Sequence, residues 1–137
     1  MTLPEKYLAG LTPQQRVIQR KLIEKSQKTY QETGKVEDRP AVSSKEPPRS
    51  KHVAKFQSRY GFKITDKSKV KSQFPDVDVD GILAKGLAAY SSSGSRPNTT
   101  AQAWAHARLA SVLTGGKALQ VDKDLVGPIS KKKILSL

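Results

Sequence analysis

The clearest periodic pattern lies near the N-terminus, where apolar residues recur at helical spacing between positions 12 and 33. Thr12 is a favourable N-cap, and Gln15 completes a capping box with it. Pro13 suits the first helical position, and Gly34 follows the last turn. A narrow apolar stripe is formed by Val17, Ile18, Leu22, Ile23 and Tyr30. Such a helix is expected to pack on a partner or to lie over a surface.

Shorter periodic segments predict further helices. The apolar spacing from Val53 to Tyr60 predicts a helix over 51–60 that Gly61 ends, and Asp66 can open another turn of helix. A helix is also predicted over 78–90, with carboxylates at its start, where the helix dipole favours them.

A turn-rich loop is expected at 91–98, before the last predicted helix. Thr99 is expected to cap that helix, with Gln102 three residues on, and the apolar pattern continues as far as Leu113. Glycines at 115 and 116 then end it.

The region between the first two predicted helices reads as a linker, because residues 34–50 contain three prolines and three serines and show no apolar periodicity. The sequence therefore predicts a mainly α protein. Its expected parts are an arm with a helix (1–33), an extended linker (34–50), a compact helical domain (51–128) and a basic tail (129–137).

Charge changes this picture. The chain has 137 residues, with 25 Lys and Arg against 12 Asp and Glu, and a formal net charge of +13. The excess of basic over acidic residues is spread evenly along the chain. Residues 1–60 contain 13 basic and 6 acidic side chains, and residues 61–137 contain 12 and 6. An even surplus indicates that the whole surface faces something anionic: nucleic acid, an acidic protein surface or an anionic lipid face. No apolar run approaches the roughly 18 residues of a membrane span, so no membrane insertion is expected.

Two sets of residues are candidates for binding an anion or a partner. In the first, small hydroxyl residues and planar donors around the loop suit a phosphate or carboxylate. This set is Ser93, Ser95, Arg96, Asn98 and Arg108. The alternative is a loop ordered by its own hydrogen bonds.

The second set is Lys51, Lys55 and Arg59, which alternate with aromatic residues. Rings interleaved with cations could stack on nucleic-acid bases. The alternative assigns the rings to the core and the cations to its solvated rim. Arm contacts are expected from the basic residues of the first helix, Arg16, Arg20, Lys21, Lys25 and Lys28.

The spacing of Asp76, Asp78 and Asp80 before Gly81 matches the first half of an EF-hand calcium loop. The second half does not match the motif, because Leu87 occupies the position that requires a bidentate carboxylate. The alternative is a set of carboxylates at a helix N-terminus, so the metal site is a weak candidate and no cofactor is expected.

No motif for catalysis is present. The chain has no cysteine, no Gly-x-Ser-x-Gly elbow, no P-loop, and only two histidines, His52 and His106, without suggestive partners. We therefore expect a protein that is not an enzyme.

Several segments resemble a family of small uncharacterised domains from large DNA viruses of algae and protists and from aquatic phages. The most specific are Gly-Ser-Arg-Pro-Asn at 94–98 and Trp-Ala-His-Ala-Arg-Leu-Ala-Ser at 104–111. The resemblance extends to about residue 124 and leaves out the Lys131–Lys133 run. It implies a viral protein, without an activity or catalytic residues to carry over.

Together these features favour a non-enzymatic structural protein of the virion, such as a minor capsid, cement or connector component that docks on larger neighbours. The alternative is a basic nucleic-acid-binding protein, packaged with a genome or part of an intracellular ribonucleoprotein. A binding titration against salt separates the two.

Overall fold

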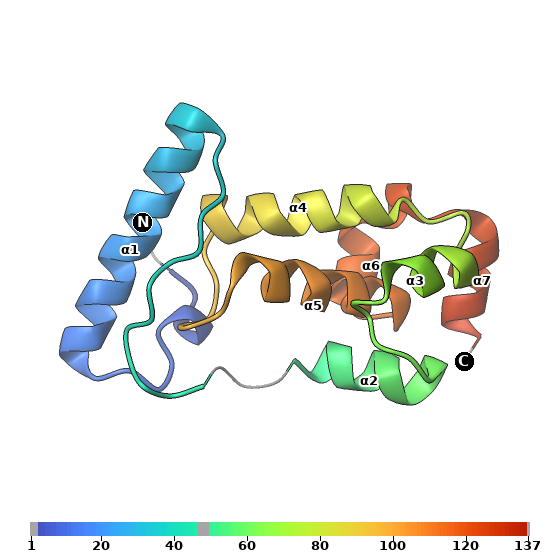
Figure 1. The fold of residues 1–137 in the computed structure, drawn as a ribbon, viewed down its shortest axis with the longest axis horizontal. Helices are drawn as coiled ribbons and strands as arrows, with labels where there is room; N and C mark the ends of the chain where they lie inside the picture. The colour runs from blue at the N-terminus through green and yellow to red at the C-terminus, as the bar shows by residue number, and fades with distance from the viewer. Residues whose placement is uncertain (1–2, 47–49, 137) are drawn as a thin grey trace. The chain divides into compact units, whose positions relative to one another are not determined.

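The computed structural model describes residues 3–46 and 50–136. It confirms a mainly α fold (Figure 1). The described residues form seven α-helices and two short 3-10 helices, and their only β pairing is an isolated bridge between Val77 and Val126. The α-helices are α1 (Pro13–Thr33), α2 (Lys51–Tyr60), α3 (Lys67–Gln73), α4 (Val79–Ser92), α5 (Ala101–Leu113), α6 (Lys117–Val121) and α7 (Pro128–Leu135). The 3-10 helices are η1 (Glu5–Tyr7) and η2 (Lys123–Leu125).

The predicted ends of α1 are confirmed. The Thr12 hydroxyl accepts a hydrogen bond from the Gln15 amide (3.2 Å), and the Gln15 side chain accepts one from the Thr12 amide (3.0 Å). The buried side of α1 differs from the predicted apolar stripe, because it is centred on Gln19, Ile23 and Gln27. These positions are four residues apart and lie on one face of the helix.

Val17 and Ile18 belong to the predicted stripe of α1 but are 51% and 49% exposed. The helix therefore turns two aliphatic side chains outward and buries two glutamines. The Gln27 side chain donates a hydrogen bond to the Ser93 carbonyl oxygen (3.4 Å), which offsets part of the cost of burying its amide.

Contacts within the chain divide it into two units. The first comprises Met1–Pro48 and Leu87–Trp104, and the second comprises Arg49–Gly86 and Ala105–Leu137. Helices α4 and α5 each contribute residues to both. The sequence suggested a different grouping, in which 51–128 formed one compact domain and 34–50 a linker.

The second unit contains the larger hydrophobic core. Phe56 of α2, Phe74 after α3, Ile82 of α4 and Leu113 of α5 are fully buried there. Phe56 is surrounded by rings, with the Phe62 ring edge-on at 5.3 Å between centroids. Of the aromatic residues that follow Lys51 and Lys55, Phe56 is buried in this core, and Tyr60 and Phe62 are partly buried against it.

Glycine allows α4 and α5 to approach closely within this unit. A Cβ atom on Gly86 would lie 2.7 Å from the Cα of Ala105. A larger residue at this position would force the two backbones apart.

Three local expectations are corrected. Ser91 and Ser92 belong to the end of α4 and not to a loop. The hydroxyl that accepts a hydrogen bond from the first turn of α5 is that of Thr100, which pairs with the Ala103 amide (3.1 Å), and not that of Thr99. The segment expected to be a tail forms α7, in which Ile134 is buried against the core.

Candidate anion-binding site

Helix α2 presents basic side chains on its outward face. Ser50 caps the helix by accepting a hydrogen bond from the Val53 amide (3.4 Å), and Gly61 ends it with a left-handed φ of 79°. Because Phe56 is buried in the core, Lys51 and Lys55, one turn apart, are exposed.

The C-terminal half of α2 borders a hollow of about 450 Å³. It is lined by Lys55, Ser58, Arg59, Thr114, Gly115, Ile134 and Leu135. Arg59 is partly committed, because its guanidinium donates hydrogen bonds to the carbonyl oxygens of Thr114 (3.3 Å) and Ile134 (2.9 Å). These contacts satisfy carbonyls at the ends of α5 and α7 and fix Arg59 at the wall of the hollow.

The hollow therefore combines a flexible cation (Lys55), a hydroxyl (Ser58) and a fixed guanidinium (Arg59). This arrangement can accept a phosphate or a carboxylate. Two hydroxyls line the hollow, those of Ser58 and Thr114. None of the lining residues is a carboxylate or a histidine, so no lining residue could act as a base toward either hydroxyl. His52, on the same helix, has a pKa lowered by burial and then by the nearby charge of Lys55, which favours its neutral form.

The predicted loop residues Ser93, Ser95, Arg96 and Asn98 belong to the first unit and are not among the residues that line this hollow. The Ser95 hydroxyl is buried, accepts a hydrogen bond from the Arg39 guanidinium (2.6 Å) and donates one to the Arg96 carbonyl oxygen (3.1 Å). The side chains of Ser93 and Arg96 are exposed.

Asn98 holds the segment that the sequence read as a linker. Its side-chain oxygen accepts a hydrogen bond from the Val42 amide (2.9 Å). Its side-chain nitrogen donates to the Ser43 hydroxyl (2.9 Å) and to the Lys45 carbonyl oxygen (2.6 Å). The Asn98 side chain therefore ties its loop to residues 42–45. The predicted linker residues 47–49 lie outside the described residues.

Arg39 is the central residue of this arrangement, and no motif or spacing indicated it. Its guanidinium lies 3.7 Å from the centre of the Tyr90 ring and donates a hydrogen bond to the Tyr90 carbonyl oxygen (2.8 Å). The Arg39 backbone amide donates to the Tyr90 hydroxyl, which itself donates to the Thr99 carbonyl oxygen (3.0 Å). Burial lowers the pKa of Arg39, and the electrostatic effects of Tyr90 and Tyr7 oppose that shift.

The sequence predicted that Arg108 binds an anion. In the structure Arg108 binds the carboxylate of Asp122 in the same chain. It donates two hydrogen bonds to Asp122, both 2.8 Å long, and Asp122 is fully buried. The hydrogen bond with Asp122 raises the pKa of Arg108. The Lys85 ammonium lies 3.8 Å from the same carboxylate. Arg108 is therefore a structural residue in this fold.

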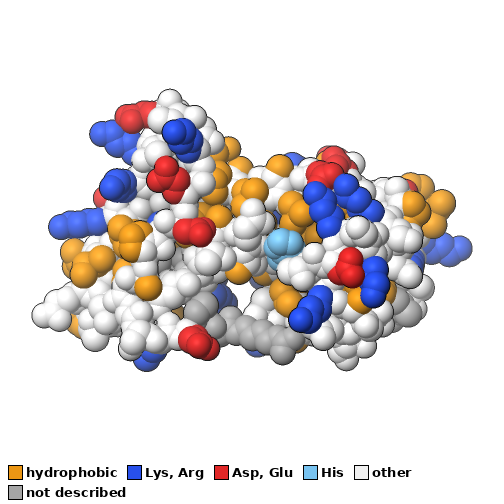
Figure 2. Space-filling view, viewed as in Figure 1, with side chains coloured by type: hydrophobic (Ala, Val, Ile, Leu, Met, Phe, Trp, Pro, Cys, Tyr) orange, Lys and Arg blue, Asp and Glu red, His pale blue; other side chains and the backbone are white. Residues whose placement is uncertain are grey.

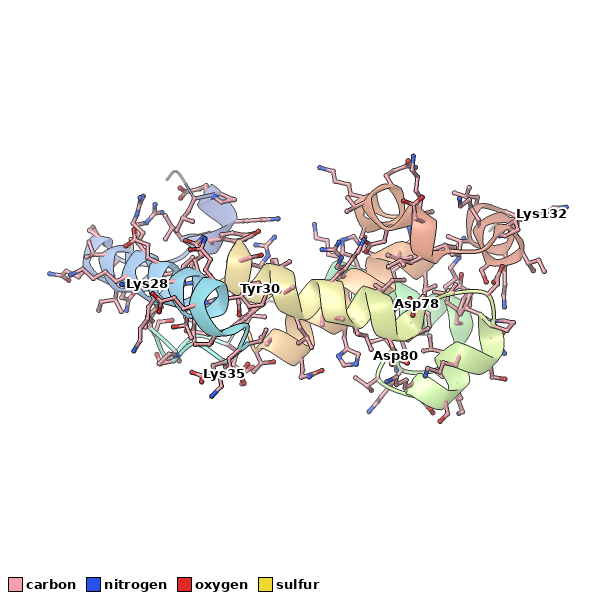
Figure 3. All side chains as sticks on the ribbon, turned by 90° about the horizontal axis from the view of Figure 1, so that it is seen from above. Lys28, Tyr30, Lys35, Asp78, Asp80 and Lys132 are labelled. Carbon is pink, nitrogen blue, oxygen red and sulfur yellow. The ribbon has the colours of Figure 1, made fainter. Side chains whose placement is uncertain are left out.

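The three carboxylates of the predicted calcium loop have separate partners. Asp76 accepts hydrogen bonds from the Ser130 amide (3.1 Å) and hydroxyl, and these lower the pKa of Asp76. Asp78 accepts one from the Gly81 amide (3.0 Å) at the start of α4, and Asp80 forms ion pairs with Lys67 and Lys71 of α3. Figure 3 labels Asp78 and Asp80. Among the residues that the structure describes, no group of three or more potential ligands could hold a metal ion.

Most predicted arm contacts of α1 are exposed. Arg16 forms an ion pair with Glu5 (2.8 Å). Arg20, Lys21, Lys25 and Lys28 are exposed and form no ion pair within the described part of the chain. Figure 2 shows Lys and Arg side chains standing out along this helix.

Within residues 3–46 and 50–136, no helix combines the length and the hydrophobicity that a membrane span requires.

In a comparison with protein families, residues 4–126 match a family model described as a family of unknown function, DUF5824. The match covers the greater part of both units and stops before α7. No curated protein matches the chain significantly, and neither does any solved structure.

Proposed function

The chain belongs to the DUF5824 family of unknown function, and from its geometry we propose that it is a non-enzymatic protein that binds nucleic acid. The observation that carries the proposal is the surplus of cations without anionic partners. With a net charge of +13, the chain turns most of its lysines outward, and the ion pairs of the described residues involve few of them. Neutralising phosphates and releasing their counterions is the main gain that such a surface can make.

Helix α2 is the proposed centre of the contact. Lys51 and Lys55 are exposed, and the helix contains no acidic residue that would neutralise them. Ser58 and Arg59 continue the same surface into the hollow, where the Arg59 guanidinium is held by two carbonyl oxygens. A phosphate on this surface would meet an ammonium and a hydroxyl together, which raises the strength of each contact.

Lysines of α3 provide a contrast. Lys67 and Lys71 both form ion pairs with Asp80. Asp80 therefore offsets part of their charge locally, and they are expected to contribute less to phosphate binding than Lys51 and Lys55.

The test is a titration of labelled DNA at several salt concentrations, monitored by fluorescence anisotropy. Affinity is expected to fall steeply with salt, with a logarithmic slope of about −0.9 for each phosphate contacted in a duplex. The double variant K51Q/K55Q should make that slope shallower by about 2. The control K67Q/K71Q removes the same charge and should change the slope less.

A flat salt response, or no binding of nucleic acid at low salt, overturns the proposal. Equal effects of the two double variants would remove α2 as the centre of contact.

A structural protein of the virion is the second candidate, and one observation favours it. Val17 and Ile18 are half exposed on α1, next to the exposed Lys21. Lys28 extends from the same helix two turns further on (Figure 3). An acidic protein surface with apolar side chains could cover both kinds of group, which a phosphate backbone could not.

This candidate places the protein in the virion, docked on a larger neighbour. Mass spectrometry of purified virions from the source of the chain tests it, and absence of the chain from the particles excludes it. The variant V17S/I18S is expected to reduce incorporation, with nucleic-acid affinity unchanged.

A further inference from the structure

The aromatic side chains that could stack on bases are buried or only partly exposed. None of the Phe, Tyr and Trp residues, all of which lie in the described part of the chain, is exposed. Phe56, Phe74 and Tyr90 are completely buried, and one face of the Tyr90 ring is covered by Arg39. Trp104 is partly buried, with the Tyr7 ring edge-on at 5.9 Å. Stacking of bases on exposed rings, the usual way of holding single strands, is therefore not offered.

Several planar polar groups are committed to contacts within the fold. Bidentate donors such as Arg and Asn distinguish bases in the major groove. Here Arg39 binds Tyr90 and Ser95, Arg108 binds Asp122, and Asn98 binds residues 42–45. The exposed arginines of the described chain are Arg20 and Arg96.

The outward cations are mainly lysines, for example Lys51 and Lys55 on α2 and Lys21, Lys25 and Lys28 on α1. A lysine ammonium is a compact point charge on a flexible stem, so it suits phosphates and carries little information about bases.

We propose that the nucleic acid bound is double-stranded and that the contact is with its phosphate backbone, independent of base sequence. This inference rests on the proposed function. A duplex carries a charge every 1.7 Å or so of axis, about twice the density of a single strand. A surface that gains only from charge therefore favours the duplex, whereas a stacking surface favours the single strand.

The experiment compares three probes of about 20 nucleotides per strand: an A·T-rich duplex, a G·C-rich duplex and single-stranded oligothymidine. We expect the two duplexes to bind with dissociation constants within about threefold of each other, and both to bind at least about tenfold more tightly than the single strand. Trp104 is the only tryptophan, and its emission should be unchanged on binding because no base stacks on it.

Each opposite result has its own meaning. Tighter binding of oligothymidine, quenching of Trp104 by the single strand or a strong preference for one duplex overturns this inference but leaves nucleic-acid binding standing. Failure of all three probes to bind at low salt overturns the proposed function itself.

Discussion

At the scale of single residues, the cations of this protein have two roles: the lysines mainly face outward, and several arginines bind acceptors within the fold. Arg39, Arg59 and Arg108 are used inside the fold, where each binds two acceptor atoms held in a fixed geometry. Arg108 is the clearest case, because both of its hydrogen bonds go to the fully buried Asp122. Burying the Asp122 carboxylate without Arg108 would be strongly unfavourable, so the stability of the fold depends on this ion pair.

The substitution Arg108→Met tests that requirement. Among the ion pairs of the described residues it leaves the buried Asp122 only that with Lys85, at 3.8 Å, and it should cost about 3 kcal/mol of unfolding free energy. Urea denaturation measures the change. The control Arg20→Met, at an exposed residue without an ion pair in the described chain, should stay within about 0.5 kcal/mol of the wild type. A small effect of Arg108→Met would show that the buried carboxylate finds another partner or becomes protonated.

Asp80 provides a prediction about pH. Hydrogen bonds from Lys67 and Lys71 lower the pKa of Asp80 from 3.8 to about 2. Because the folded-state pKa is depressed, the ion pairs stabilise the fold fully above pH 3.8, and this contribution is lost as the pH falls toward about 2. The variant Asp80→Asn should therefore lose less stability than the wild type over this interval. Parallel curves of stability against pH for the two proteins would contradict the prediction.

At the scale of elements, the most informative segment is the one from 38 to 45, which pairs with residues distant in sequence. Asp38 accepts a hydrogen bond from the Ala101 amide at the start of α5 (2.8 Å), and Asn98 holds residues 42–45. Asn98 adopts a left-handed φ of 63°, a conformation that asparagine tolerates better than most residues. Its side chain and its backbone both contribute to holding the segment.

Substitution of Asn98 separates these two contributions. Asn98→Ala removes the side-chain hydrogen bonds and strains the backbone, and should cost about 2–3 kcal/mol. Asn98→Gly removes the same hydrogen bonds without the strain, and should cost about 1 kcal/mol less. Hydrogen exchange of the Val42 amide should accelerate in both variants. Unchanged protection of that amide would mean that other contacts hold the segment.

Helix packing gives a second prediction at this scale. Gly86→Ala places a methyl group against the backbone of Ala105 and should destabilise the second unit by about 1–3 kcal/mol. Ala84, an exposed position on the same helix, provides the comparison, since Ala84→Ser should change stability by less than about 0.5 kcal/mol. Thermal unfolding followed by circular dichroism measures both.

At the scale of the whole molecule, the net charge of +13 opposes folding, because like charges are brought closer together in the compact state. Screening this repulsion should stabilise the protein, so the melting temperature is expected to rise between about 20 and 300 mM sodium chloride. Differential scanning fluorimetry can follow the shift. A melting temperature that falls over this range would show that ion pairs, which salt also weakens, dominate the balance.

The local parts of the fold were predictable because their signals lie close together in the sequence. The capping box of Thr12 and Gln15 and the glycine that ends α2 act within one turn of backbone. The apolar stripe predicted for α1 is covered only in part, with Val17 and Ile18 half exposed, because apolar spacing defines a stripe but does not say which neighbours will cover it. Helix α7 was predicted as a basic tail, because three consecutive lysines before the buried Ile134 obscure its apolar pattern.

The candidate site was likewise predictable from the sequence only in part. The sequence by itself determined the charge, the mainly α fold and the basic residues of α2, because composition and helix periodicity are local properties. Only the tertiary structure decided which of those residues remain available to a partner. Arg39 and Tyr90 lie 51 positions apart, and Asn98 and Lys45 lie 53 apart. Pairings at such separations depend on how the whole chain closes on itself, and no local spacing records them.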